Sequence, residues 1–258
     1  MKAKQASEAT SLEQILNIWH LFDSFPMETM TKAWLLKNSK NPRQRSVEQM
    51  RLHRQRFGAS GNCFDLAIWL LGYLKDAGLN AYYVGNNLGN QKAHVGVVAM
   101  GDRGDRYLCD LGDLWIKPVN LDIAIVNEPG YFTGARISVH IESEVAQVLY
   151  ERSNCKTSRQ LYSLTPIPEN EFLDAAHISQ NTLSRPLIET RVYRSNEVIH
   201  WEFENNRSFF SSMDGLQEEP QLNTQAEWSQ RIHKMTGMDP RYVSECFDAF
   251  NEISGEKV

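Results

Sequence analysis

The spacing of apolar residues divides the chain into a helical N-terminal part, a strand-rich middle and a helical C-terminal part. Within residues 11–80, an apolar stripe at helical spacing predicts a first helix, with Ser11 as its cap; the stripe consists of Leu12, Ile15, Leu16 and Trp19. The segment Ser46–Phe57 predicts a further helix. From Thr224 onward, two helical patterns are separated by Gly237 and Pro240, and Pro240 is expected at a helix start.

Between residues 81 and 205, the pattern changes to short β-branched and aromatic runs, which predict an antiparallel sheet or open barrel. These runs are Ala81–Val84, Val95–Ala99, Arg106–Asp110, Ser138–Ile141, Arg159–Leu164 and Thr190–Tyr193. Residues 145–153 and 168–181 contain helix-favouring polar residues, so helices and long loops both stay open there. The expected fold is α+β: a helical domain (1–80), a β-barrel or sheet domain (81–205) and a small C-terminal α/β lid (206–258).

Cys63 stands where a thiol nucleophile would benefit from a helix N-terminus. Gly61 and Asn62 predict a turn, and the run that follows is apolar at helical spacing, at Phe64, Ile68, Leu71 and Leu74. Exposed backbone N–H groups in the first turn of a helix favour an anion, and they also suit an oxyanion hole. A free cysteine is only a few per cent thiolate at neutral pH, so a working nucleophile also needs a cationic partner such as an imidazolium.

His94 and Asp110 supply the other two groups of a Cys-His-Asp triad. His94 precedes a valine-rich strand, and Asp110 ends the next strand, across a turn over residues 101–105. Adjacent antiparallel strands would place the two side chains together, with the acid orienting the imidazole towards the sulfur. Cys109 is expected to face the core, on the opposite strand face from Asp110.

Several segments in this order resemble the arylamine N-acetyltransferases, within the wider group of transglutaminase-like thiol enzymes, over about residues 15–200. The matching stretches are LFDSFPMETMTK, FGASGNCFDLAIWLLGYLKDAGLNAYYVG, AHVGVVAM, RYLCDLGDLW and RQLYSLTPIPENEFLDAAHISQNTLSRPLIETRVYR. The resemblance implies that Cys63, His94 and Asp110 are catalytic. It further implies a two-step transfer of an acyl group from acetyl-coenzyme A or another thioester to an aryl amine or hydrazine.

The chain departs from the family's motifs at positions that bear on the acyl donor. The arginine of the family's cysteine box is replaced by Ala59 or Ser60, and its glutamate by Asp65. After the catalytic aspartate, Gly112 is retained, but Asp113-Leu114 replaces Phe-Gly in the loop that lies near the coenzyme A pyrophosphate in the family. Because like charges repel, we expect acetyl-coenzyme A to bind weakly or in another pose. An acyl-carrier-protein thioester is then a second candidate donor.

Composition fits a globular enzyme without a nucleic-acid or membrane partner. The 258 residues carry a formal net charge of -5, which argues against a nucleic-acid surface. The chain has no apolar run of about 20 residues, and its N-terminus lacks the apolar segment of a secretory signal, so a cytoplasmic location is expected. The four scattered cysteines lack metal-binding spacing, and no metal site is expected.

Structural alternatives accompany each residue singled out. A lone cysteine is usually a buried apolar residue, a lone histidine is usually bonded to a backbone carbonyl, and an aspartate beside glycine is common in turns. Trp115 and Phe132 would line an acceptor pocket or belong to the core. The ordered set of three favours catalysis, but two other functions use the same residues. One is a transglutaminase-like or amidase-type thiol hydrolase, and the other is a binding module that retains the fold without activity.

Overall fold

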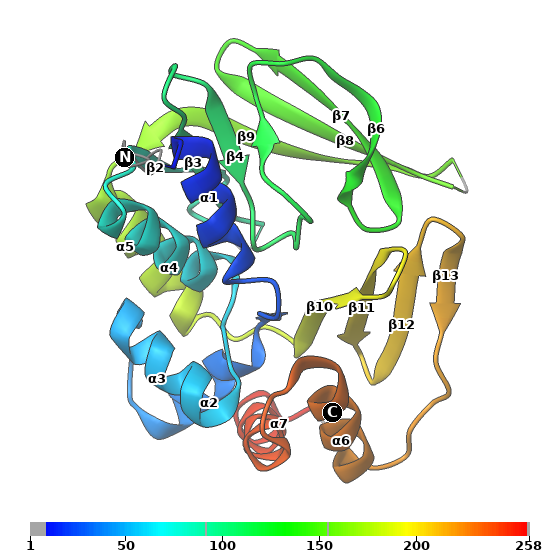
Figure 1. The fold of residues 1–258 in the computed structure, drawn as a ribbon. Helices are drawn as coiled ribbons and strands as arrows, with labels where there is room; N and C mark the ends of the chain where they lie inside the picture. Colours follow the sequence, from blue (N-terminus) through cyan, green and yellow to red (C-terminus); the bar gives the residue numbers. More distant parts are fainter. Residues whose placement is uncertain (1–8, 91, 154, 257–258) are drawn as a thin grey trace, which may run out of the picture.

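The computed structural model describes residues 9–90, 92–153 and 155–256, which form helices and two antiparallel sheets (Figure 1). The helices are α1 (Ser11–His20), α2 (Met30–Asn38), α3 (Val47–Phe57), α4 (Cys63–Asp76), α5 (Glu169–Asn181), α6 (Gln225–Thr236) and α7 (Pro240–Ser254). The α+β fold class predicted from the sequence is therefore confirmed. None of the helices in these three ranges is both long and apolar enough to cross a membrane.

The larger sheet has eight strands in the order β5-β4-β3-β2-β9-β8-β7-β6. Their bounds are β2 (Ala81–Asn86), β3 (His94–Met100), β4 (Arg106–Cys109), β5 (Val119–Asn120), β6 (Ile125–Phe132), β7 (Ala135–Glu142), β8 (Val145–Arg152) and β9 (Thr157–Ile167). The backbone N–H of Ile116, just before β5, donates to the carbonyl of Tyr131 in β6 (2.8 Å). Because this bond joins the two ends of the sheet, the sheet curls into an open barrel.

The smaller sheet joins two distant parts of the chain. Its order is β1-β10-β11-β12-β13, with bounds β1 (Met27–Glu28), β10 (Leu187–Tyr193), β11 (Val198–Glu204), β12 (Arg207–Ser212) and β13 (Gly215–Glu218). The expected domain boundary at residue 205 falls in the turn between β11 and β12. The chain passes from the larger sheet to the smaller one earlier, through α5 and residues 182–186.

Each sheet has its own apolar core. Helix α4 is buried on most sides and packs on β2 and β3, in a cluster that also contains Trp19 and Tyr162. A second cluster lies between the smaller sheet and the last two helices (Figure 1), and its members include Met30, Trp201 and Phe247. Since Met30 belongs to α2, this second core binds the N-terminal helices to the C-terminal pair. The Glu28 N–H of β1 donates to the Gly61 carbonyl (2.9 Å), so the turn before α4 lies against the smaller sheet.

Local capping differs from the prediction at the first helix. Thr10 is the cap: its Oγ1 accepts a hydrogen bond from the Glu13 N–H (3.3 Å), and the Glu13 carboxylate accepts one from the Thr10 N–H (2.9 Å). Ser11 instead lies inside the helix and donates through its backbone N–H to Asp102 (2.9 Å). Thr10 and Glu13 thus form a reciprocal capping box at the start of the helix.

Two segments left open by the sequence pattern take different structures. Residues 145–152 form strand β8, whose Ala146, Val148 and Tyr150 face the core at alternate positions. Residues 169–181 form helix α5, which begins after Pro168. Helix-favouring residues in β8 point outwards, and pairing with β7 and β9 outweighs their intrinsic preference.

Candidate active site

Cys63 is the first residue of α4, and the residues beside it hold its backbone in place. The Asn62 side chain accepts hydrogen bonds from the N–H groups of Phe64 (2.9 Å) and Asp65 (3.1 Å). In return, the Asp65 carboxylate accepts one from the Asn62 N–H (3.0 Å), which completes a capping box. As a residue, Cys63 is half-buried, unlike Cys109 and Cys246, which are buried. Cys109 belongs to the core, as predicted.

His94 and Asp110 are directly bonded to each other. His94 Nε2 lies 2.5 Å from Asp110 Oδ2, and the same oxygen accepts a hydrogen bond from the Tyr162 hydroxyl (2.5 Å). The other carboxylate oxygen accepts from the Asp113 N–H (2.9 Å). With all of this carboxylate buried, these bonds fix its orientation and leave the second imidazole nitrogen, Nδ1, for another partner.

Gly112 brings the cysteine and the aspartate together. A Cβ added at this glycine would lie 2.5 Å from Cys63 Cβ, 3.0 Å from Cys63 Cα and 3.3 Å from Asp110 Oδ1. The loop after β4 therefore packs directly on the first turn of α4, and only a glycine permits this approach. Cys63, Asp110 and, through its bond to Asp110, His94 consequently gather in one small region. The structure places the three residues together; their catalytic roles stay a prediction.

For both His94 and Cys63, burial and a neighbouring charge shift the pKa in opposite directions. Burial by itself lowers the pKa of His94, but the charge of Asp110 and the hydrogen bond to it outweigh burial and raise that pKa to about 9. Burial raises the pKa of the Cys63 thiol to about 12, while the positive charge of Lys32 lowers it. A thiolate at Cys63 therefore depends on nearby positive charge, which Lys32 supplies and which a protonated His94 would add.

Lys32 and Arg45 belong to this region although the sequence pattern gave no sign of them. Arg45 Nη2 pairs with the Asp65 carboxylate (3.0 Å), and both side chains are almost fully buried. The same nitrogen donates to the Ser60 carbonyl (3.0 Å). The family's cysteine box has an arginine that is missing from residues 59 and 60, yet a buried arginine does support this turn, from 18 positions before Cys63.

Asp113 does not project freely into the site. Its carboxylate accepts hydrogen bonds from Trp115 Nε1 (3.0 Å) and from the Tyr150 hydroxyl. Burial and the neighbouring Asp110 raise the pKa of Asp113 to about 6. Trp115 itself is buried, and Phe132 packs its ring edge-on against Tyr150 (4.8 Å between centroids). Both aromatic residues thus support the Asp113 loop.

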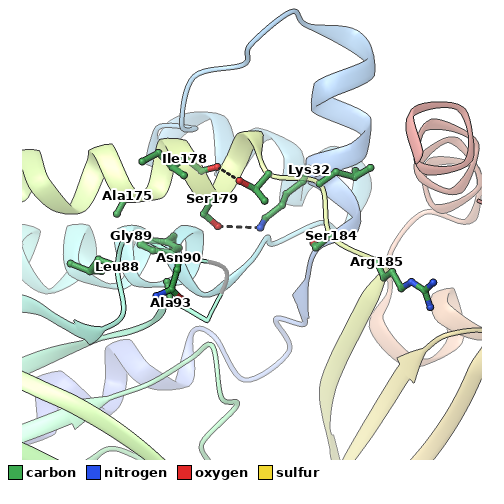
Figure 2. Close-up of a pocket in the computed structure, with 13 residues that line it drawn as sticks. Lys32, Leu88, Gly89, Asn90, Ala93, Ala175, Ile178, Ser179, Ser184 and Arg185 are labelled. Carbon is green, nitrogen blue, oxygen red and sulfur yellow. Dashed lines mark hydrogen bonds between the residues drawn. The ribbon is translucent and has the colours of Figure 1, made fainter. Parts of the chain in front are cut away.

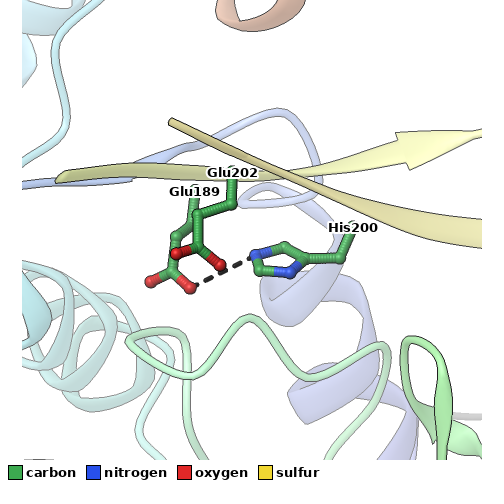
Figure 3. Close-up of side chains that lie close together, drawn as sticks. All are labelled: Glu189, His200 and Glu202. Carbon is green, nitrogen blue, oxygen red and sulfur yellow. Dashed lines mark ion pairs between the residues drawn. The ribbon is translucent and has the colours of Figure 1, made fainter. Parts of the chain in front are cut away.

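Two carboxylates and a histidine lie close together on the smaller sheet (Figure 3). Glu189 and Glu202 are opposite each other on β10 and β11. One carboxylate oxygen of each and one ring nitrogen of His200 form a group of three atoms that lie within 4.8 Å of one another. His200 Nε2 pairs with Glu189 (3.3 Å). Burial and the charge of Glu189 raise the pKa of Glu202 to about 7. The charge of Glu189 also raises the pKa of His94.

Comparison with known proteins identifies the fold. No protein-family model and no curated protein sequence matches this chain. Solved structures do match it, among them the arylamine N-acetyltransferase of Mycobacterium marinum in complex with CoA, at a TM-score of 0.73 and 10% identity over 94% of this chain and 93% of that one. The Salmonella typhimurium enzyme matches at a TM-score of 0.71 and 12% identity, covering 96% and 94%.

A third match has a variant triad. This arylamine N-acetyltransferase from Bacillus cereus, described as having a Cys-His-Glu catalytic triad, matches at a TM-score of 0.66 and 16% identity, covering 91% of this chain and 94% of that one. The resemblance drawn from the sequence is thus confirmed at the level of the fold, over nearly the whole chain. At such low identities, the likeness establishes the fold and leaves the activity to be argued from the site.

Proposed function

We propose that this protein is a thiol acyltransferase, which moves an acyl group from a thioester through Cys63 to an amine acceptor. The observation that carries the proposal is the packing of Gly112 on Cys63, because it sets a half-buried cysteine beside the bonded His94 and Asp110 pair. The fold shared with arylamine N-acetyltransferases supports the same reaction and favours an aryl amine or hydrazine as the acceptor.

In the first step, the Cys63 sulfur attacks the thioester carbonyl carbon. The negative charge moves to the carbonyl oxygen, where the Cys63 backbone N–H stabilises it, because the Phe64 and Asp65 N–H groups already donate to the Asn62 side chain. The tetrahedral intermediate then expels the donor's sulfur, which takes a proton from the His94 imidazolium. Asp110 holds the ring in one orientation throughout and stabilises its charged form, without accepting the proton itself.

In the second step, the acceptor amine attacks the Cys63 thioester. His94, now neutral, removes a proton from the attacking nitrogen, and collapse of the intermediate releases the amide and restores the sulfur. The negative charges of Asp113 and Glu189 act on His94 and favour a basic acceptor over an acidic one beside the ring.

The donor that we propose is a thioester of coenzyme A or of the same pantetheine arm on a carrier protein. A carboxylate at position 113 was expected to repel a pyrophosphate. Its bonds to Trp115 and Tyr150 turn this carboxylate towards the protein, which reduces the expected repulsion. Coenzyme A and a carrier protein present the same pantetheine arm, so their thioesters can be compared directly as donors.

Intact-mass analysis after incubation with a panel of thioesters tests the proposal. We expect an acyl adduct on the wild-type protein and none on the Cys63→Ser variant, because the serine hydroxyl is a much weaker nucleophile. Cys155→Ser is the matched control and should acylate normally, since Cys155 is exposed and remote in sequence from the triad. An adduct mapped to any other cysteine would refute the assignment. The panel contains acetyl-coenzyme A and an acylated carrier protein, so it also identifies the donor.

The fate of the acyl group separates transfer from hydrolysis. Adding an aryl amine to the isolated acyl-enzyme should produce the amide faster than water produces the free acid. If the amine leaves the rate of deacylation unchanged and no amide forms, the protein is a thiol hydrolase on this fold.

A further inference from the structure

A pocket lies beside the chain neighbours of Cys63 and His94. It encloses about 520 Å³ between α2, α5, the loop before β3 and residues 182–185 (Figure 2). Phe64 and Ala93 are part of its lining, and these residues are the chain neighbours of Cys63 and His94. The charge of Lys32, which also lines the pocket, acts on the Cys63 thiol. A ligand in this pocket would therefore be close to the reactive sulfur.

The polar groups that line this pocket are suited to an anion. Lys32 and Arg185 supply positive charge, and Ser179, Ser184 and Asn90 supply hydroxyl and amide groups. The described lining contains no aspartate or glutamate. Arg185 is already bound to Asn205 and Glu256, which leaves Lys32 as the cation that is available to a ligand.

Lys32 is a buried ammonium with spare hydrogen-bonding capacity. The residue is only 8% exposed, and among the described residues its Nζ makes one hydrogen bond, to Ser179 Oγ (3.1 Å; Figure 2), and no ion pair. An ammonium has three donors. The nearby carboxylates of Glu28 and Asp65 are already bonded to Thr31 and Arg45. A buried charge without a partner is costly, so a ligand that pairs with Lys32 would be bound strongly.

Ser184 provides a second, independent indication of a ligand. Its Oγ is buried and has no hydrogen-bond partner in the described part of the chain, although the residue lines the pocket. Buried hydroxyl groups are nearly always satisfied, by protein or by a bound molecule. Lys32 and Ser184 thus line the same pocket, and each has hydrogen-bonding capacity that the described residues do not use.

We propose that the pocket binds a carboxylate carried by one of the two substrates, with Lys32 as its ion-pair partner and the Ser184 hydroxyl as a further donor. A single available ammonium matches the single charge of a carboxylate better than the double charge of a phosphate. The carboxylate belongs either to the acyl group or to the acceptor. The assignment to a substrate depends on the proposed acyl transfer, whereas the binding of a carboxylate does not.

Binding is measured on the Cys63→Ser protein, which cannot turn over a thioester. Benzoate and the neutral benzamide serve as probes, followed by NMR titration. We expect benzoate to bind at least tenfold more tightly than benzamide. Lys32→Met should remove this preference, Lys32→Arg should restore part of it, and Ser184→Ala should weaken benzoate binding severalfold without removing a hydrogen bond that the fold uses. Lys37→Met on the same helix is the control, because Lys37 is exposed and pairs with Glu252.

Equal affinity for benzoate and benzamide, or benzoate binding that survives Lys32→Met, would overturn the proposal. Folding of each variant is checked by its NMR spectrum before titration. This binding measurement needs no catalysis. If no thioester gave an acyl-enzyme, the proposed function would be refuted, but the titration would still decide whether the pocket binds a carboxylate.

Rate ratios in the wild-type background identify which substrate carries the carboxylate. Succinyl and butyryl thioesters are compared in acyl-enzyme formation, and 4-aminobenzoate and aniline are compared in deacylation. Lys32→Met also changes the pKa of the Cys63 thiol. This change affects both substrates of a pair alike, so it cancels in each rate ratio. A tenfold fall in the succinyl to butyryl ratio assigns the pocket to the acyl group, and a similar fall in the aminobenzoate to aniline ratio assigns it to the acceptor. If neither ratio changes, the pocket does not bind a substrate carboxylate.

Discussion

Groups of opposite charge act on the reactive sulfur. The positive charge of Lys32 lowers the pKa of the Cys63 thiol, and the negative charge of Asp110 raises it. Asp110 is bonded to His94, Tyr162 and a backbone N–H at once, so its charge is held in one place. The distribution suits a reaction in which a negative charge forms on the sulfur and a positive charge forms on the ring.

Asp110→Asn should lower the pKa of His94 from about 9 towards or below its ordinary value of 6.5, because the neutral amide no longer stabilises the imidazolium. A raised histidine pKa stabilises the fold fully below about pH 6.5, and this contribution is lost as the pH rises through about 9. The variant should therefore be less stable by about 3 kcal/mol near pH 6 and much closer to wild type near pH 10. NMR titration of the ring and urea unfolding at both pH values measure the two effects.

A loss of stability that is equal at both pH values would contradict this explanation. Asp122→Asn is the matched control. Asp122 is paired with Arg106 at the surface, so we expect a change below about 1 kcal/mol that is flat across this range.

The residues that sequence analysis found and those it missed differ in where their partners lie. Cys63, His94 and Asp110 occur in short, ordered motifs, so they could be read from the sequence together with the strands that carry them. Lys32 bonds to Ser179, which is 147 positions away, and no local pattern records such a contact. Tyr162 was missed for the same reason, since an aromatic residue in a strand normally indicates core packing.

At the scale of elements, two short loops determine where the site forms. The turn before α4 is stabilised by the capping side chain of Asn62 and by the buried pair of Arg45 and Asp65. The loop after β4 approaches this turn at Gly112. Strand β8 was ambiguous in the sequence because residues that favour a helix occur there together with the alternation of buried and exposed positions that is typical of a strand. Strand β3 was clear because its valines favour a strand.

Arg45→Met should destabilise the protein by about 3–5 kcal/mol, because it leaves the Asp65 carboxylate buried without its cation. Adding Asp65→Asn should recover most of this loss. Urea unfolding of the single and double variants measures both values. Arg106→Met breaks a more exposed pair with Asp122 and should cost about 1 kcal/mol or less. Equal losses from Arg45→Met and Arg106→Met would show that the buried pair contributes no more than the surface pair.

At the scale of the whole molecule, the two ends of the chain share a core. Met30 of α2, Trp201 of β11 and Phe247 of α7 belong to one apolar cluster, although they span more than 200 positions. The division into domains 1–80, 81–205 and 206–258 therefore remains a proposal about the chain's organisation. The sequence supports the element types in each part, but only tertiary packing reveals which parts depend on one another.

The chain should accordingly unfold in a single cooperative transition. Urea curves followed by far-ultraviolet circular dichroism and by tryptophan fluorescence should coincide, since tryptophans occur in both apolar clusters. Removing residues 224–258 should expose the second cluster and abolish that transition. Separate midpoints for the two probes, or a truncated chain that still unfolds cooperatively, would instead support independent domains.

Gly61 has a consequence for how related sequences can vary. A Cβ there would lie 2.2 Å from Asp65 Oδ2 and 2.3 Å from Arg45 Nη2. Because glycine has no Cβ, the ion pair of Arg45 and Asp65 can occupy this volume. A homologue that keeps both charges should therefore keep the glycine. Loss of the guanidinium alone does not free position 61, because an added Cβ would still meet the Asp65 carboxylate and because Gly61 has a φ of 122°, which favours glycine.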